Sequence, residues 1–162
     1  MAQRKKAAAG KTPANSKVHM VEVVLPNDAN PTGNLLGGKV MHLMDIAAAI
    51  AAHRHSRRMV VTASVDKLEF LHPIKVGQLV LLEAVVTCAF RTSMEVEVNV
   101  FSEDILSGER LHTSTAYFTF VALDNSGHPV PVARLSPVTA SEKRKCREAQ
   151  KRREVRLKDK RR

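Results

Sequence analysis

Residues 36–52 of this 162-residue chain read LGGKVMHLMDIAAAIAA. Apolar residues recur in this stretch at intervals of three and four, which is the spacing of one face of a helix. We therefore expect a helix from Leu36 to about Ala52. Because its opposite side is also largely apolar, we expect this helix to be buried nearly all round.

Five strand-like segments lie around the expected helix in the sequence. Residues 93–101 and 113–123 alternate between apolar and polar side chains, which predicts an antiparallel sheet with one wetter face. One helix cannot cover both faces of such a sheet, so we expect an α+β fold in which a curved antiparallel sheet wraps around one long central helix. Its edge strand would pair with a second copy of the chain. The five segments are residues 18–25, 60–70, 79–90, 93–101 and 113–123.

The formal net charge of +10 lies in the two ends of the chain. Residues 1–18 carry +5 and residues 141–162 carry +8, so the body between them is mildly acidic. We expect a disordered basic N-terminal tail at 1–17, one domain at 18–138 and a basic helical C-terminal tail at 139–162. Residues 139–142 read TASE, which is the pattern of a capping box at the start of a helix. The C-terminal tail could reach a phosphate or an anionic partner. We favour a solvated or weakly interacting helix and expect no specific nucleic-acid binding.

Several protein classes are excluded by the composition. No apolar run is long enough to span a membrane and none follows the basic N-terminus, so we expect neither membrane insertion nor a secretory signal. A mitochondrial transit peptide is the alternative for the basic residues 1–17. The two cysteines, Cys88 and Cys146, are far apart in sequence and predict a reducing compartment without a disulfide framework. His53 and His55 have no cysteine or carboxylate at metal-binding spacing, and we expect no metal and no cofactor.

Asp45 is the first candidate for chemistry, because it places a carboxylate inside an otherwise apolar helix. A buried charge is costly unless it is paired, so such an acid is either structural or functional. Gly37 and Gly38 open the same helix, where their N–H groups could stabilise a developing oxyanion; a tight turn with close packing is the alternative. Asn30 lies in the preceding loop, and its side-chain amide can both donate and accept; an ordinary turn residue is the alternative.

Two other chemistries are disfavoured by the sequence. Residues 33–40 match the G-x-x-x-x-G-K pattern of a nucleotide-binding loop, but Val40 stands where that loop needs Ser or Thr, and a loop rather than a strand precedes it. There is no Gly-x-Ser-x-Gly motif, and neither cysteine has the surroundings of a nucleophile. We therefore expect a general base that activates water, with Asp45 as the base and His42 as a neighbour able to pair with it.

Four groups of residues together resemble the signature of a known family. The match covers roughly residues 18–138 and keeps its spacing across all four groups, which is more specific than any one of them. The family is that of the hotdog-fold acyl-CoA thioesterases, in particular the cytosolic (brain-type) acyl-CoA hydrolases and their bacterial relatives. The groups read PNDAN…GNLLGG…M…MD at 26–45, VTASVD…F…PI…G at 61–77, RTSMEV at 91–96 and AYFTFVALD at 116–124.

The resemblance implies a hotdog fold and the hydrolysis of fatty acyl-CoA to free fatty acid and coenzyme A in the cytoplasm. It also implies homodimers, commonly assembled into hexamers, with sites between subunits. The family's catalytic residues correspond to Asn30 and Asp45, so we expect Asn30 of one subunit to face Asp45 of the other. Gly37 or Gly38 would bind the carbonyl oxygen, and direct attack by Asp45 stays open. Candidates for binding the coenzyme A part are Ala63, Ser64, Val65, Phe70, His72, Arg91, Thr92 and Ser93.

Two competing functions have features that distinguish them from hydrolysis. A non-catalytic acyl-CoA-responsive binding or regulatory protein could use the same domain, with the basic tail serving nucleic acid or membrane. Such a sensor has no need of a base in the helix, so the pair of Asn30 and Asp45 speaks against it. A hydratase of this fold would show Asp-x-x-x-x-His, whereas the residue five after Asp45 is Ile50.

Overall fold

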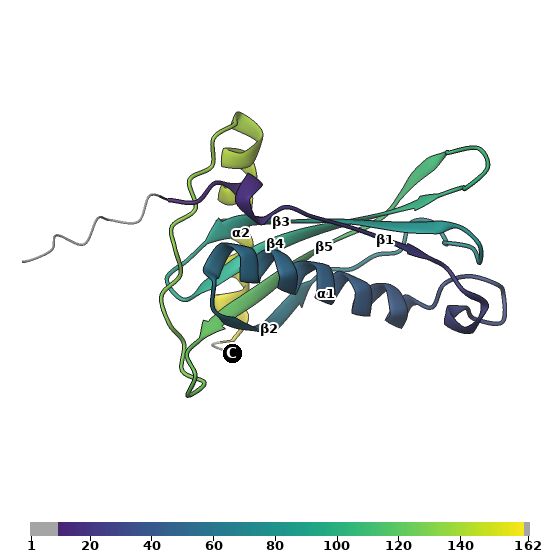
Figure 1. The fold of residues 1–162 in the computed structure, drawn as a ribbon. Coiled ribbons are helices and arrows are strands. Elements are labelled where there is room, and N and C mark those ends of the chain that lie inside the picture. The colour runs from purple at the N-terminus through teal and green to yellow at the C-terminus, as the bar shows by residue number, and fades with distance from the viewer. Residues whose placement is uncertain (1–9, 161–162) are drawn as a thin grey trace, which may run out of the picture.

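The computed structural model describes residues 10–160, which form one antiparallel sheet with a helix on each face (Figure 1). The strand order is β1-β3-β4-β5-β2, and all neighbouring pairs are antiparallel. This confirms the predicted sheet around a central helix. In chain order the elements are η1 (Pro13–Ser16), β1 (Val18–Val23), η2 (Pro26–Asp28), α1 (Gly37–Ser56), β2 (Met59–Asp66), β3 (Leu79–Ala89), β4 (Ser93–Glu103), β5 (Arg110–Leu123) and α2 (Ala140–Asp159).

The central helix α1 forms where its periodicity predicts, and runs one turn further than expected. It ends at Ser56, where Arg57 adopts a left-handed conformation with φ of 53°. The face toward the sheet is fully buried and rich in alanine, which lets the helix approach the strands closely. The expectation of burial all round is wrong for the single chain. Met41, Ile46 and Ile50 are 36–45% exposed because the sheet covers only one side of the helix.

Strand β2 is an edge of the sheet, because it pairs with β5 and with no other strand of residues 10–160. It ends at Asp66 rather than at residue 70, and Lys67 then takes a positive φ of 24°. Three large apolar side chains are exposed on it: Met59, Val61 and Val65. Together with the exposed side of α1, this strand forms an apolar face that supports pairing with a second copy.

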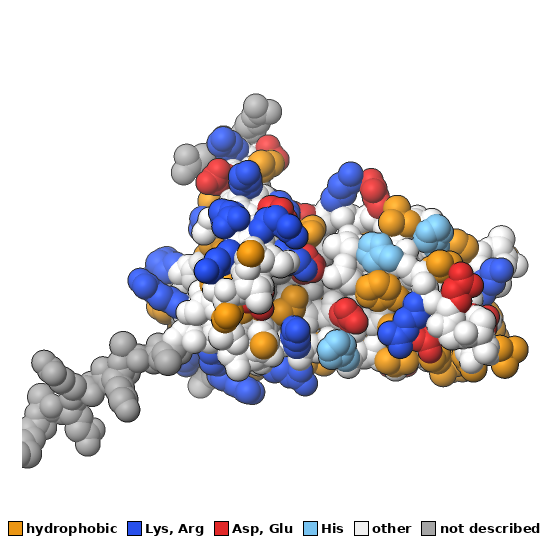
Figure 2. Space-filling model, turned by 90° about the horizontal axis from the view of Figure 1, so that it is seen from above, with side chains coloured by type: hydrophobic (Ala, Val, Ile, Leu, Met, Phe, Trp, Pro, Cys, Tyr) orange, Lys and Arg blue, Asp and Glu red, His pale blue; other side chains and the backbone are white. Residues whose placement is uncertain are grey.

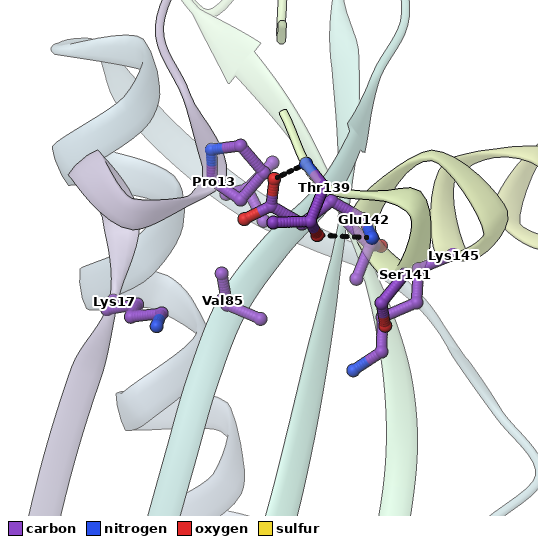
Figure 3. A pocket seen from close by; sticks show the side chains of 9 residues that line it. Pro13, Lys17, Val85, Thr139, Ser141, Glu142 and Lys145 are labelled. Atoms are coloured by element: carbon purple, nitrogen blue, oxygen red, sulfur yellow. Dashed lines mark hydrogen bonds between the residues drawn. The ribbon is translucent and has the colours of Figure 1, made fainter. Parts of the chain in front are cut away.

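The C-terminal helix α2 is docked on the outer face of the sheet, which corrects the expectation of a solvated helix. Its capping box is confirmed, because the Thr139 hydroxyl accepts from the Glu142 N–H at 3.1 Å (Figure 3). Lys145 pairs with Glu97 at 2.6 Å, and Arg152 donates two hydrogen bonds to the fully buried Glu95. The cations left on the outside gather at the end of the molecule that carries α2 (Figure 2).

A second correction concerns the cysteines. Cys88 in β3 and Cys146 in α2 are joined by a disulfide across 58 residues of sequence, whereas the sequence predicted none. Their distance along the chain was no guide, because the docking of α2 on β3 brings them together. The bond therefore fastens the same helix that the ion pairs hold.

A third correction concerns the expected N-terminal tail. Residues 10–17 are ordered: they form η1, and the buried hydroxyl of Ser16 accepts from the Val86 N–H at 2.9 Å. Lys11 Nζ donates to the carbonyl oxygen of His55 at 2.6 Å and so caps the end of α1. Residues 1–9 lie outside the described part of the chain. None of the helices within residues 10–160 is long and apolar enough to cross a membrane.

We expect the stability of the fold to depend on His55, which is fully buried at the end of α1 and donates through Nε2 to the Ala133 carbonyl at 2.8 Å. Burial lowers the pKa of His55, the Ala133 contact opposes this, and the charge of Lys11 adds to the lowering. The unfolded chain then binds a proton, below a pH of about 6.5, that the folded chain does not. Stability should therefore fall as the pH drops below that value, by at most about 1.4 kcal/mol per pH unit.

Urea unfolding at several pH values between neutral and mildly acidic tests this. The variant His55→Gln keeps a donor for Ala133 but cannot titrate, so its stability should fall less steeply with pH than that of the wild type. The exposed His128→Gln serves as the control and should follow the wild type. An equal slope in His55→Gln and the wild type would contradict the assignment.

Candidate active site

The first turn of α1 presents two unused backbone donors. Lys39 and Val40 donate their N–H groups to the Leu36 carbonyl, at 3.0 and 3.1 Å. The N–H groups of Gly37 and Gly38 have no acceptor among residues 10–160. Nothing lies within 4 Å of the position that a Cβ of Gly38 would take, so the helix is open at Gly38. An oxyanion at this point would meet the positive end of the helix dipole.

Asn30 is held rigidly in the loop before α1. Its Oδ1 accepts three hydrogen bonds: from the N–H and hydroxyl of Thr32, at 3.0 and 2.7 Å, and from the Asn34 N–H at 3.1 Å. The left-handed Gly33, with φ of 79°, closes this turn. Because Oδ1 is already occupied, the side-chain NH₂ group is the part of Asn30 available to a ligand. The Asn30 side chain was expected to donate and to accept hydrogen bonds, but in this turn it can only donate them to a ligand.

A cavity of about 340 Å³ brings four of the predicted residues together. Asn30, Gly37, Phe70 and His72 all line it. The Phe70 ring lies against Gly37 so closely that a Cβ there would be 3.3 Å from it. The close-packing role that we considered for Gly37 is thus real. The other walls are mainly apolar, which suits a hydrocarbon chain better than a nucleotide.

Asp45 is paired with Thr62. Thr62 belongs to the VTASVD group of the family signature, but it was not predicted as a site residue. The Thr62 hydroxyl donates to Asp45 Oδ1 at 2.6 Å, across from α1 to β2. Asp45 Oδ2 has no hydrogen-bond partner within the described chain. His42, which we considered as a partner of Asp45, forms no hydrogen bond with it. A break in the register of β2 between Thr62 and Ser64 adjoins the pair, and such irregularities are common beside active sites.

Asn30 and Asp45 are not brought together within one chain. Asp45 lies eight residues after Gly37, which is about 12 Å along the helix axis, and Asn30 lies beyond the other end of that stretch. A single chain therefore holds the carboxylate in one place and the amide and helix N-terminus in another. This separation agrees with the expectation that the two residues meet across a subunit interface, which stays a prediction.

The expected coenzyme A residues are also spread out. Ala63, Ser64 and Val65 follow Thr62 on the edge strand β2. Arg91 and Thr92 lie in the turn between β3 and β4, Ser93 begins β4, and the Thr92 carbonyl accepts from the Ala122 N–H at 2.9 Å. Phe70 and His72 lie at the opposite end of the sheet, where Leu71 donates to Thr113. Thr113 and Ala122 are nine residues apart on β5, so the two groups are roughly 30 Å apart within one chain.

Comparison with known proteins decides the family. Residues 32–109 match the model of the thioesterase superfamily. An uncharacterised acyl-CoA thioester hydrolase of Bacillus subtilis is 47% identical over 127 residues, which cover 78% of this chain and 74% of that protein. This chain belongs to the acyl-CoA thioester hydrolase family. Membership confirms the predicted resemblance and, with the topology above, the hotdog fold.

Two solved structures of the family resemble the hydrolase domain described here over nearly its whole length. An apo hexameric acyl-CoA thioesterase has 42% identity and a TM-score of 0.88, over 91% of this chain and 95% of that one. A Staphylococcus aureus acyl-CoA hydrolase, with butyryl coenzyme A and coenzyme A, has 36% identity and a TM-score of 0.86, over 93% of this chain and 92% of that one.

Variants of the Staphylococcus aureus hydrolase have also been solved, in which one asparagine, one aspartate and one threonine are each replaced by alanine. In that chain the three residues follow one another at intervals of 15 and 17 residues. The same intervals separate Asn30, Asp45 and Thr62. The hydrogen bond from Thr62 to Asp45 is the structural signal that sequence periodicity could not provide.

Other concave places lack this combination of groups. A cavity of about 170 Å³ between η1, β3 and the start of α2 is lined by three charged side chains, of which Lys145 pairs with Glu97, Glu142 caps the helix and Lys17 is the third (Figure 3). Within residues 10–160 no group of three or more His, Cys, Asp or Glu side chains could hold a metal ion.

Proposed function

We propose that this chain hydrolyses acyl-CoA thioesters, with Asp45 as the general base. The observation that carries the proposal is the Asp45 carboxylate, which accepts a hydrogen bond from the Thr62 hydroxyl at 2.6 Å and has no other partner within the described chain. The membership of the chain in the thioester hydrolase family supports it further. One carboxylate oxygen is fixed by the hydroxyl, and the other is left to bind a water molecule. A base oriented in this way needs little rearrangement to accept a proton.

The reaction then proceeds by attack of that water on the thioester carbonyl carbon while Asp45 takes its proton. The carbonyl oxygen becomes an oxyanion, which the N–H groups at the start of α1 and the Asn30 NH₂ group stabilise. Collapse of the tetrahedral intermediate expels the thiolate of coenzyme A and leaves the fatty acid. Asn30 acts only as a donor, because its oxygen is held by Thr32 and Asn34.

The site is proposed to be complete only in a dimer, where Asn30 and the helix N-terminus of one subunit meet Asp45 and Thr62 of the other. The exposed apolar face of α1 and β2 supports this, because Met41, Ile46 and Met59 would be buried by such pairing. Two equivalent sites would follow from one symmetric interface. A hexamer built from three such dimers is proposed by analogy with the hexameric relative.

The cytoplasm is the proposed location, in keeping with the resemblance to the cytosolic hydrolases. Cytoplasmic thiols are normally reduced, so the ion pairs of Glu95 and Glu97 would then hold α2 without the Cys88–Cys146 bond. The absence of a cofactor also stays a proposal, and a water nucleophile with an oriented carboxylate supports it. Non-catalytic binding through a polyanion-binding tail is disfavoured, because three cations of α2 are turned inward onto the sheet.

Thiol release from a panel of acyl-CoA esters of different chain length tests the activity. We expect hydrolysis of at least one ester by the pure protein, and a large loss of rate in Asn30→Ala. Mixing Asn30→Ala with Asp45→Ala subunits should restore part of the rate, because a mixed dimer contains one intact site. No hydrolysis of any ester by the pure wild type would end the proposal, and no recovery on mixing would end the shared site.

Replacing Thr62 should lower the rate without removing it. A hydrogen bond to a charged group contributes about 1.5–3 kcal/mol, so we expect Thr62→Ala to reduce kcat by roughly 10- to 100-fold. Thr62→Ser keeps the hydroxyl and should recover most of the activity, whereas Thr62→Val keeps the shape and should not. Equal rates in the serine and valine variants would show that the hydroxyl does not orient Asp45.

A further inference from the structure

Two arginines in the turn between α1 and β2 have no partner for their charge. Within residues 10–160 neither the Arg57 nor the Arg58 guanidinium forms an ion pair or a side-chain hydrogen bond. Their backbone is firmly placed: the Arg57 N–H donates to the His53 carbonyl at 2.8 Å, and the Arg58 carbonyl accepts from His53 Nδ1 at 2.8 Å. Arg57 also keeps a left-handed conformation with φ of 53°, which is uncommon for a residue with a side chain.

The helix end does not explain these charges. Cations do stabilise the C-terminus of a helix, but Lys11 already fills this role by donating to the His55 carbonyl at 2.6 Å. Burial and the nearby charge of Arg57 both lower the pKa of Lys11, so another cation at this place adds repulsion. An uncompensated cluster of this kind is stabilised when an anion binds.

The two arginines border a cleft that is larger than the two cavities described above. It is a cleft of about 510 Å³, whose walls are the turn itself, His53 and Met59 beside it, and the end of β5 with the turn that follows. Its carboxylate, Asp124, does not neutralise the arginines. Asp124 Oδ1 instead accepts the N–H groups of Ser126 and His128, both at 2.9 Å.

The distance from the cleft to the proposed base can be estimated along α1 and along β2, and the two estimates agree. From Asp45 to His53 the chain advances eight residues along α1, which is about 12 Å. From Thr62 back to Arg58 it advances four residues along β2, which is about 13 Å. The turn therefore joins α1 and β2 at their left ends in Figure 1, and the Asp45–Thr62 hydrogen bond links the same two elements further along.

We infer that Arg57 and Arg58 bind the phosphate groups of the nucleotide half of an acyl-CoA substrate in this cleft. The inference rests on the proposed function. With the thioester at Asp45, an extended pantetheine arm is long enough to carry the phosphates to the turn. Guanidinium groups match phosphate oxygens in geometry as well as in charge. Thr92 lies at the same end of the sheet, since it bonds Ala122, the β5 partner of Val60.

The test compares acyl-CoA with the corresponding acyl-pantetheine, which has the same thioester and no phosphate. In Arg57→Gln/Arg58→Gln, KM for acyl-CoA should rise about tenfold or more with kcat kept, because binding that is equal in ground and transition states is lost. Both kinetic constants for acyl-pantetheine should stay as in the wild type. Arg147→Gln, an exposed and unpaired arginine of α2, is the matched control and should change neither.

Calorimetry with adenosine 3′,5′-bisphosphate separates this inference from the proposed function, because it needs no turnover. The wild type should bind it more weakly as salt is added, and the double arginine variant should lose most of that affinity. Unchanged affinity and unchanged KM in the variant would overturn the inference. A loss of rate with both substrates would also overturn it, because a phosphate contact cannot affect a substrate without phosphate.

Discussion

Replacing Asp45 with alanine or asparagine should reduce acyl-CoA hydrolysis by roughly 10²- to 10⁴-fold, the range typical for the loss of a general base. Asparagine keeps the size of the side chain and the hydrogen bond from Thr62, so the loss in Asp45→Asn isolates the charge. We expect kcat to fall and KM to change little, because the proton moves only in the reaction step. Thiol release under saturating substrate measures the effect.

The control for Asp45 is Glu22→Gln, which removes a carboxylate from the exposed face of β1. It should hydrolyse acyl-CoA at the wild-type rate. Single turnover in water labelled with heavy oxygen separates the two roles left open for Asp45. A general base leaves the label in the fatty acid, whereas direct attack followed by hydrolysis at the aspartyl carbonyl leaves it in Asp45. Undiminished hydrolysis by a folded Asp45→Ala would refute both roles.

Removing Arg152 should cause the second large effect, this time on stability. Glu95 is fully buried and accepts two hydrogen bonds from Arg152, at 2.8 and 3.0 Å, and one from the Thr87 hydroxyl at 2.9 Å. Arg152→Met leaves a buried carboxylate without its main partner. Breaking such a pair costs about 3–5 kcal/mol. We expect about 2–3 kcal/mol, because Arg156 still lies 3.9 Å from Glu95 and Arg152 is 25% exposed.

Urea unfolding at one fixed protein concentration measures this loss. The double variant Glu95→Leu/Arg152→Met removes both charges and should be more stable than Arg152→Met alone, because no buried charge remains unpaired. Arg144→Ala is the control in the same helix. Its pair with Glu148 at 3.8 Å is mostly exposed, so its stability should stay within about 0.5 kcal/mol of the wild type. A double variant as unstable as the single one would contradict the pairing.

The N-terminal half of the site could be anticipated because its signals are local. Two glycines open the helix, and a carboxylate interrupts its apolar face. The partner of that carboxylate could not be anticipated, because Thr62 is an ordinary threonine in a strand. It becomes a site residue only when β2 returns beside α1. The same holds for Asn30, whose donor role depends on the turn that occupies its oxygen.

The alternating pattern of β4 shows most clearly where local signals end. Its polar positions predicted a wetter face, yet Glu95 is fully buried and Glu97 is 5% exposed. The alternation itself was right, since the valines at the positions between them are buried in the core together with the buried residues of α1. A period of two tells which residues share a face but not what covers that face. Here α2 covers it, and its cations pair with the two carboxylates.

The sequence by itself therefore determined the central helix, the five strands, the cap of α2 and the place of Asp45 in the chain. Helix and strand periodicity and capping act over a few residues, so neighbouring residues suffice to read them. Only the tertiary structure decided the Thr62–Asp45 pair, the docking of α2, the Cys88–Cys146 bond and the arginine cleft. These depend on strand register and on which faces meet, and both are fixed by contacts between residues far apart in the chain.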